Sequence, residues 1–176
     1  MNFNEIPQFT NVGGYEINVP LNFLDKRIKE WEEDELSKLQ INPDFQRGHV
    51  WNEKQQINFV EYFLRGGASG RVLYFNSPSW MGCMEKLEYD EFVLVDGLQR
   101  LTALLKFLRN EIKVFGLYCS EFEGKLQTTR ANMNLRINVN NLKTKNDVLT
   151  WYIEMNSGGT PHTEDEINRV KELLEK

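Results

Sequence analysis

Apolar side chains along this chain recur with two different periods, and each period predicts a different kind of element. Spacings of three and four residues give a helix one buried face. On this basis we expect helices at residues 22–31, 52–65, 98–109 and 147–155, and a last one from residue 163 onward. Short alternating or continuous apolar runs predict strands at residues 15–19, 39–41, 72–75, 92–95 and 135–139.

The starts of two helices and the buried face of a third are predicted in more detail. Asn52 with Gln55, and Thr163 with Glu166, each have the spacing of a capping box, in which two side chains bond each other's backbone at a helix start. In the helix predicted at residues 22–31, the side chains expected to face inward are Phe23, Leu24, Ile28 and Trp31.

Together these elements predict a single α+β domain over residues 1–176. A chain of this length buries about 70% of the surface that its unfolded state exposes, so it needs no disulfide or metal to fold. Pro7 and a glycine pair predict an irregular lead-in over residues 1–14. Residues 77–90 are expected to form a long loop, of the kind that serves as a lid or a contact surface.

Charge is distributed unevenly along the chain. The net charge is −5, which does not favour a general nucleic-acid binder, but residues 97–145 hold nine Lys or Arg against three Glu, a local +6. We call residues 97–145 the basic stretch. It is either a set of solvated surface charges or a weak, electrostatic contact for DNA. There is no signal peptide and no long apolar run, so we expect a cytoplasmic protein without a membrane span. The two Cys and two His show no metal-ligand spacing.

The strongest candidate for a functional site is the sequence Asp96-Gly97-Leu98-Gln99-Arg100, where an apolar strand leads directly into a helix. The first backbone N–H groups of a helix lack internal partners, and the helix dipole adds partial positive charge there, so this junction suits an anion. Gly97 lets a ligand approach the backbone, and Arg100 offers a planar cation for phosphate. Asp96 is expected to cap the helix, to hold Mg²⁺ or to orient a water, and Gln99 to bond a phosphate, a ribose or a water. In the alternative interpretation, Asp-Gly is an ordinary helix entry and Arg100 pairs with a carboxylate.

Two further segments have side chains suited to the same chemistry. Residues 42–51 form a predicted loop that places Arg47 between two elements, while Phe45 and Trp51 are expected to be core side chains. Residues 156–162, Asn-Ser-Gly-Gly-Thr-Pro-His, are either a phosphate-binding nest or a turn before the last helix.

Taken in order, these three segments resemble the N-terminal domain family of the GmrSD type IV restriction endonucleases, which belongs to the ParB/sulfiredoxin-like superfamily. The resemblance covers about residues 15 to 170, and Gly97-x-x-Arg100-x-x-Ala103 also resembles the phosphate motif of ParB proteins. It implies a ParB-like fold, a small mixed sheet with helices around it. It also implies nucleotide binding at Gln46, Arg47, Gly97, Gln99, Arg100 and Thr102.

The function expected from this resemblance is binding and slow hydrolysis of a nucleoside triphosphate, with Asp96, Arg100 and Arg47 as the catalytic residues and Asp96 as the Mg²⁺ ligand. One alternative is a nucleotide-gated module for DNA or a partner protein, without turnover, in phage or host defence or counter-defence. Another is a phosphotransferase or a weak nuclease on the same fold. Restriction members carry a C-terminal nuclease domain with a His-Asn-His motif, and residues 1–176 contain no counterpart, so we expect no coupled DNA cleavage.

Overall fold

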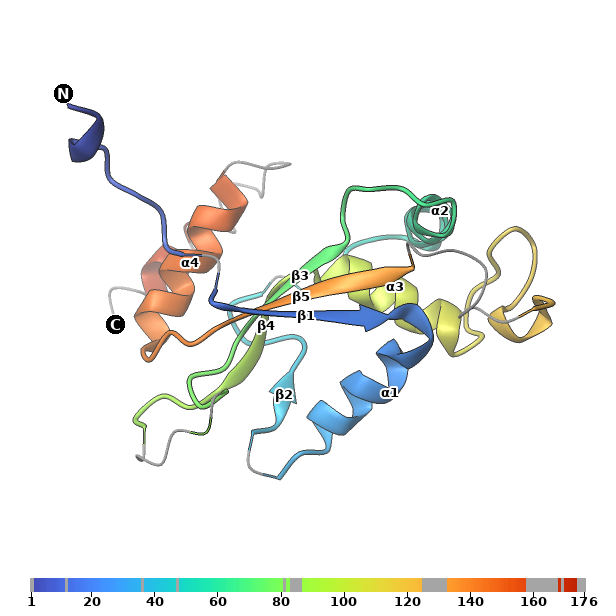
Figure 1. Ribbon diagram of the computed structural model, residues 1–176, viewed down its shortest axis with the longest axis horizontal. Helices are drawn as coiled ribbons and strands as arrows, with labels where there is room; N and C mark the ends of the chain where they lie inside the picture. The colour runs from blue at the N-terminus through green and yellow to red at the C-terminus, as the bar shows by residue number, and fades with distance from the viewer. Residues whose placement is uncertain are drawn as a thin grey trace.

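The computed structural model describes residues 2–11, 13–35, 37–46, 48–80, 82, 87–124, 133–157, 168 and 170–173 (Figure 1). The strands are β1 (Tyr15–Pro20), β2 (Leu39–Gln40), β3 (Val72–Asn76), β4 (Phe92–Asp96) and β5 (Asn134–Asn140). The helices are α1 (Leu21–Glu32), α2 (Glu53–Leu64), α3 (Leu98–Leu108) and α4 (Lys145–Ser157), with short 3-10 turns η1 (Phe3–Glu5) and η2 (Cys119–Glu121). All five predicted strands and the first four predicted helices are therefore confirmed.

The strands form one five-stranded mixed sheet in the order β1-β5-β3-β4-β2. β5 lies between β1, to which it is antiparallel, and β3, to which it is parallel. β4 is antiparallel to β3 and parallel to β2. The predicted α+β fold with a small mixed sheet and surrounding helices is confirmed. The pairing of β2 with β4 matters most for the site, because parallel neighbours end at the same edge of a sheet.

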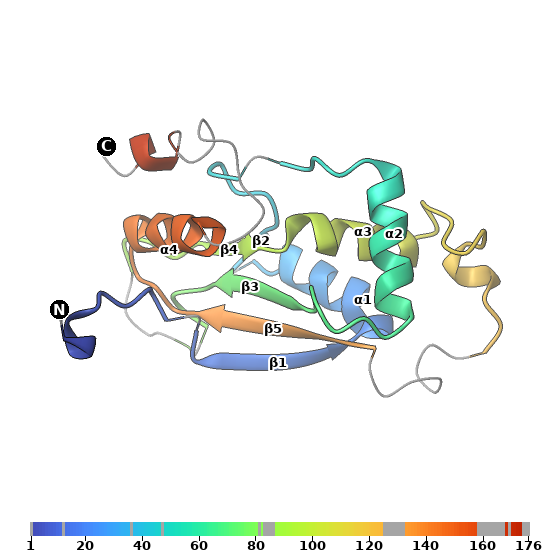
Figure 2. The same cartoon turned by 90° about the horizontal axis from the view of Figure 1, so that it is seen from above.

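Helices cover both faces of β4, the most buried strand. Its side chains alternate between two clusters, as the two-residue period of a strand requires. Phe92 and Leu94 join the larger cluster, which α1, α2 and α3 complete, while Val93 and Val95 pack with Trp151 of α4. In the structure, α4 accordingly lies apart from the group formed by α1, α2 and α3 (Figure 2). This burial on both faces explains why β4 is continuously apolar rather than alternating.

One side chain in α1 was assigned to the wrong face. Phe23 was predicted to point inward, but it is 51% exposed, whereas Leu21 is 1% exposed. The helix begins at Leu21, one residue before the predicted start, and its buried stripe is Leu21, Leu24 and Ile28. At 100° per residue, Phe23 lies about 200° from Leu21 and therefore faces solvent.

The helix-start prediction at Asn52 is confirmed by both bonds of the capping box. The backbone N–H of Gln55 donates to Asn52 Oδ1 over 3.0 Å, and the backbone N–H of Asn52 donates to Gln55 Oε1 over 2.9 Å. The second predicted capping box, Thr163 with Glu166, lies outside the described residues. Val170, which falls in the range predicted for the last helix, is 2% exposed.

The lead-in and the long loop have little regular structure, as predicted. Residues 2–11 contain only the short turn η1 and extend away from the sheet (Figure 1). Of the predicted loop 77–90, residues 77–80, 82 and 87–90 are described, so its proposed role as a lid is not tested. No helix among the described residues combines the length and the apolar character needed to cross a membrane.

Candidate functional site

The candidate site lies where β2 and β4 end side by side. β4 ends at Asp96, and the chain enters α3 through Gly97. β2 runs parallel to β4, with Gln40 opposite Val93, so the segment that follows β2 lies beside the end of β4. Ligands of open α/β sheets bind outside the carboxyl ends of such strands. Two of the predicted segments, 42–51 and 96–100, therefore meet at one edge of the sheet.

Gly97 shapes the amino end of α3. Its φ is +112°, a conformation that side chains rarely adopt, and an added Cβ would lie 2.4 Å from Cδ2 of Leu73. Gly97 is the N-cap and has no side chain to bond the first turn, so the prediction that Asp96 caps α3 is wrong. Among the described residues, nothing accepts a hydrogen bond from the amides of Leu98, Gln99 or Arg100; the first intrahelical bond is Leu101 N–H to Gly97 O, 2.8 Å. The start of α3 thus presents the unpaired N–H groups that an anion site requires.

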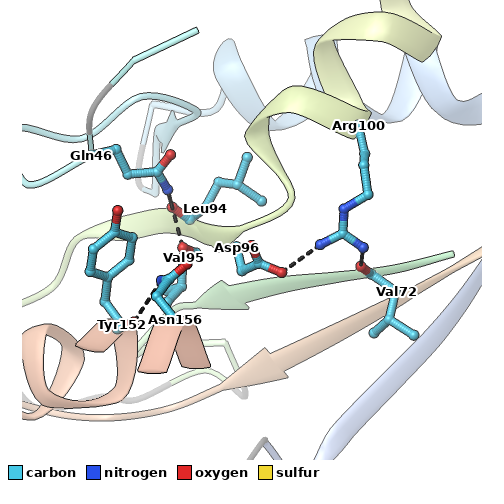
Figure 3. A network of polar contacts seen from close by, with 8 residues as sticks. All are labelled: Gln46, Val72, Leu94, Val95, Asp96, Arg100, Tyr152 and Asn156. Atoms are coloured by element: carbon cyan, nitrogen blue, oxygen red, sulfur yellow. Dashed lines mark hydrogen bonds and ion pairs between the residues drawn. The ribbon is translucent and has the colours of Figure 1, made fainter. Parts of the chain in front are cut away.

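Arg100 is bound to the protein itself (Figure 3). Its Nη2 donates to Asp96 Oδ2 over 2.5 Å and its Nη1 to the Val72 carbonyl over 2.8 Å. The side chains of Arg100 and Asp96 are 19% and 35% exposed. Arg100 is not among the buried residues of α3, such as Leu98 and Leu101. Its charge is already paired with a carboxylate, as in the alternative interpretation. The pair is neutral as a unit, so the positive potential here comes from α3.

Gln99 is hydrogen-bonded to the segment that precedes α2. Its Oε1 accepts hydrogen bonds from the amides of Val50 and Trp51, over 2.9 and 3.0 Å. Its Nε2 donates to the Gly48 carbonyl over 2.8 Å. Gln99 thus joins α3 to residues 48–51 through three hydrogen bonds, and the acceptor capacity of its oxygen is used up.

Gln46, which also lies in the 42–51 segment, binds the end of β4. It is 8% exposed, and its Nε2 donates to the carbonyls of Leu94 and, over 3.3 Å, of Val95. Figure 3 shows this amide above the end of β4, with Tyr152 beside it. Arg47, the next residue, lies outside the described residues, so its predicted place beside Asp96 is not tested.

The remaining predicted site residues lie farther along the two helices. Thr102 lies in the second turn of α3 and is partly buried. Asn156, near the end of α4, donates from Nδ2 to the Tyr152 carbonyl over 2.7 Å, and both residues lie beside the end of β4 (Figure 3). Residues 158–162, the rest of the predicted nest or turn, lie outside the described residues.

The structure neutralises much of the basic stretch. Four of its basic side chains pair with carboxylates outside it: Arg100 with Asp96, Arg109 with Asp25, Arg136 with Glu16, and Lys145 with Asp44. In the segment before α2, burial lowers the pKa of His49, and the nearby charge of Lys106 lowers it further. This lowered pKa favours the neutral form of His49 at pH 7. Carboxylates outside the basic stretch thus offset at least four of its nine basic charges.

The described residues do not fit a dedicated metal site. No group of three or more His, Cys, Asp or Glu side chains comes together among them. Asp96, the predicted Mg²⁺ ligand, belongs to no such group among the described residues, and its Oδ2 is bound to a cation, Arg100. Its role as a metal ligand stays a prediction.

Some contacts of the site had no signal in the sequence. Arg100 and Gln99 bind backbone atoms of Val72, Gly48, Val50 and Trp51, and side-chain type says nothing of where a carbonyl or an amide will lie. Gly70 is the residue that comes closest to indicating where the Arg100 side chain lies. Its φ is +73°, and an added Cβ would lie 3.4 Å from Cδ of Arg100.

Comparison with known proteins agrees with the resemblance in the sequence. The family model described as GmrSD restriction endonuclease, N-terminal domain, matches residues 28–137, which is 110 of the 176 residues. The matched range runs from α1 to β5 and contains both the 42–51 segment and the β4–α3 junction. No curated protein and no solved structure matches the chain.

Proposed function

Because the chain belongs to the family of the GmrSD restriction endonuclease N-terminal domain, we propose that it binds a nucleoside triphosphate at the amino end of α3. We propose further that it hydrolyses this nucleotide slowly, as the nucleotide-responsive part of a restriction-type system. The nucleotide is the substrate, and its phosphates occupy the junction between β4 and α3.

The observation that carries the proposal is the uncapped start of α3. The amides of Leu98, Gln99 and Arg100 have no acceptor among the described residues, and Gly97 contributes no side chain that would cover them. Aligned peptide dipoles place about half a positive charge at such a helix end. Phosphate oxygens satisfy both the unpaired donors and this charge, which is why helix starts bind phosphate in unrelated folds.

A cation other than Arg100 is needed beside the start of α3, because a triphosphate carries several negative charges. Asp96 already offsets the charge of Arg100. Arg47 is our candidate for the phosphate contact, since its neighbours Gln46 and Gly48 are both hydrogen-bonded to the β4–α3 junction. A bidentate guanidinium suits a phosphate in the ground state and stabilises charge that develops on the transferring group.

Turnover in this site is expected to be slow. Asp96 directly precedes Gly97, the N-cap of α3, and its Oδ2 is occupied by Arg100, which leaves Oδ1 to orient a water. Any Mg²⁺ would enter with the phosphate oxygens of the nucleotide, as is usual for this ion. Hydrolysis would therefore depend on charge stabilisation and water orientation by the chain's own residues.

The Asp96–Arg100 pair also favours a second candidate, nucleotide binding without hydrolysis. If the pair stays closed when nucleotide is bound, the Arg100 guanidinium and Oδ2 of Asp96 stay bound to each other and not to the phosphates, and the domain acts as a nucleotide-gated module. Measurement of phosphate release separates the two candidates.

The test is a thermal-shift panel of ATP, GTP, CTP and UTP, with and without Mg²⁺, on the whole chain. A nucleotide at 100 times its dissociation constant stabilises the native state by about 2.7 kcal/mol, which raises Tm by about 5 °C or more. Arg47→Ala should lose this shift. Arg27→Ala is the matched control, because Arg27 makes only an exposed pair with Glu30 on α1. If no nucleotide shifts the wild type, or if Arg47→Ala responds like the wild type, the proposal is wrong.

A further inference from the structure

We propose that the turn at residues 114–117 and the adjacent face of α2 form a surface through which two copies of this chain associate about a twofold axis. We call this surface the tip; its side chains are Glu61, Arg65, Glu111, Lys113, Phe115 and Leu117. It lies beyond the carboxyl end of α3, whereas the proposed nucleotide site lies at the amino end of that helix. The segment after α3, drawn in yellow, projects past α2 (Figures 1 and 2). The role of the tip therefore does not depend on the proposed function.

The backbone of residues 114–117 forms a tight turn that two hydrogen bonds close. The backbone N–H of Val114 donates to the Leu117 carbonyl over 2.8 Å, and that of Leu117 donates to the Val114 carbonyl over 3.1 Å. The two central residues, Phe115 and Gly116, have φ of +51° and +79°. A turn with positive φ at both central positions strongly favours Asn, Asp or Gly there. Glycine is thus the expected residue at 116, whereas phenylalanine is a strained choice at 115.

Phe115 is not buried in return for this strain. Its side chain is 43% exposed, and that of Leu117 is 40% exposed. Other positions anchor the turn, since Ile112 and Val114 are buried in the larger core cluster. Backbone strain in a folded protein concentrates at functional positions, and aromatic side chains are enriched at the centres of protein interfaces. Phe115 is therefore placed for contact with a partner rather than for folding.

On the α2 side of the turn, Glu61 and Arg65 contact Phe115 and not each other. The Arg65 guanidinium lies over the Phe115 ring, 5.1 Å from its centroid. Oε1 of Glu61 accepts a hydrogen bond from the backbone N–H of Phe115 over 3.3 Å. On α1, Asp25 and Lys29 have the same four-residue spacing and form an ion pair over 2.7 Å. Arg65 has no ion pair with any described residue, so its charge stays available to a partner.

Both signs of charge also occur on the segment that enters the turn. Residues 111–115 alternate between exposed and buried positions, so Glu111 and Lys113 lie on the same outward face as Phe115. The Lys113 ammonium lies over the Tyr118 ring, 4.8 Å from its centroid, and pairs with no carboxylate in the part of the chain that the structure describes. The tip thus combines an apolar centre with two cations and two carboxylates.

This charge pattern fits a second copy of the chain better than it fits a nucleic acid. Two cations and two carboxylates leave the tip without net charge, whereas a surface that binds single strands needs a positive groove. In contact about a twofold axis the same patch meets itself, so each cation can meet a carboxylate of the other copy. The side chains of Phe115 and Leu117 then bury each other's apolar surface. A patch of one sign would instead repel its copy.

The test is analytical ultracentrifugation of the whole chain without nucleotide, from about 1 µM to about 1 mM, the range in which small interfaces associate. The wild type should form dimers in this range. Phe115→Asn should weaken the dimer at least about tenfold, because a central aromatic side chain carries much of the energy of an interface. Phe9→Asn is the matched control, since Phe9 is an exposed phenylalanine in the lead-in, and it should leave the dimer unchanged. In dilute solution Phe115→Asn should unfold in urea no earlier than the wild type, because Asn suits the turn.

A second experiment tests the charge pattern. Glu111→Lys leaves three cations against one carboxylate in the tip, and Lys113→Glu leaves one cation against three carboxylates. Each variant alone should dimerise more weakly than the wild type, because like charges then face each other. An equal mixture of the two should form mixed dimers at least as tight as those of the wild type. At about 1 M salt, where the Debye length is about 3 Å, these differences should largely disappear.

Four results would overturn the proposal. The first is a wild type that stays monomeric at about 1 mM; if it then binds a single-stranded oligonucleotide and Phe115→Asn does not, the tip binds nucleic acid instead. The second is a dimer that Phe115→Asn leaves intact or that Phe9→Asn disrupts. The third is a mixture of Glu111→Lys and Lys113→Glu that associates no better than either variant alone. The last is a marked loss of stability in monomeric Phe115→Asn, which would mean that Phe115 serves folding.

Discussion

The pairing of Arg100 with Asp96 and Val72 gives a quantitative prediction for the free protein. Arg100→Ala removes a partly buried ion pair and a charge-assisted hydrogen bond to a carbonyl. Exposed ion pairs contribute about 0.2–1 kcal/mol, whereas breaking a fully buried one costs about 3–5 kcal/mol. With side chains 19% and 35% exposed, this pair lies between those limits, and we expect a loss of about 2 kcal/mol.

One opposing contribution has to be subtracted. Arg100 lies in the first turn of α3, where a positive charge is unfavourable by about 0.3–1 kcal/mol. Removal of the charge recovers that amount, so the expected net loss is about 1.5 kcal/mol. For a chain of this size, that lowers Tm by about 3–6 °C. A position off the buried face of α3 and against the helix dipole would by itself indicate an arginine that is dispensable for stability; the contacts with Asp96 and Val72 reverse that expectation.

The assay is a set of melting curves without nucleotide. Arg27→Ala is the matched control, because its partner Glu30 lies 3.0 Å away and the two side chains are 51% and 45% exposed. We expect this control to lose less than about 0.5 kcal/mol. Asp96→Asn should reproduce most of the effect of Arg100→Ala, and the double variant should lose less than the sum of the two.

The reasoning fails if Arg100→Ala melts within about 1 °C of the wild type. In that case the contacts of Arg100 contribute nothing to stability, and its guanidinium is available to a phosphate, as the sequence predicted. Nucleotide affinity of Arg100→Ala and of Arg47→Ala would then show which arginine makes the contact.

Three further predictions concern other parts of the chain. Gly97→Ala should destabilise by more than Gly116→Ala when both are unfolded in urea, because both have positive φ but only Gly97 has a core side chain within contact of an added Cβ. For Asp25, burial raises the pKa, but hydrogen bonds from Lys29 and Arg109 outweigh burial and lower it overall. The stability from these pairs is therefore present above the unfolded pKa of about 3.9 and is lost as the pH falls through the folded pKa. The Tm of Asp25→Asn should be lower than that of the wild type at pH 7, and the two should converge once the pH is below the folded pKa. Binding to DNA should be weak and should decline with a log–log salt slope of about −0.9 per neutralised phosphate; tight binding that ignores salt would contradict the observed pairing of the basic stretch.

Local elements could be predicted from the sequence because their causes are local. The period of apolar side chains placed β1 to β5 and α1 to α4, and the capping box at Asn52 fixed the start of α2. The error at Phe23 came from a shift of one residue in the start of α1, which period alone does not resolve. The order of the strands could not be read in this way, since β5 enters between β1 and β3 from the far end of the chain.

For the candidate site, the sequence by itself determined which side chains are present and where a helix with a bare, glycine-capped start would follow a buried strand. It did not determine what those side chains bind. Gln99 and its partners at 48–51 are about fifty residues apart, and they meet only because β2 pairs in parallel with β4. Arg100 reaches the Val72 carbonyl because the antiparallel pairing of β3 with β4 carries residue 72 past the end of β4. Its other partner, Asp96, lies only four residues before it in the sequence. Hydrogen bonds depend on the positions of both partners, and tertiary pairing alone sets the second position.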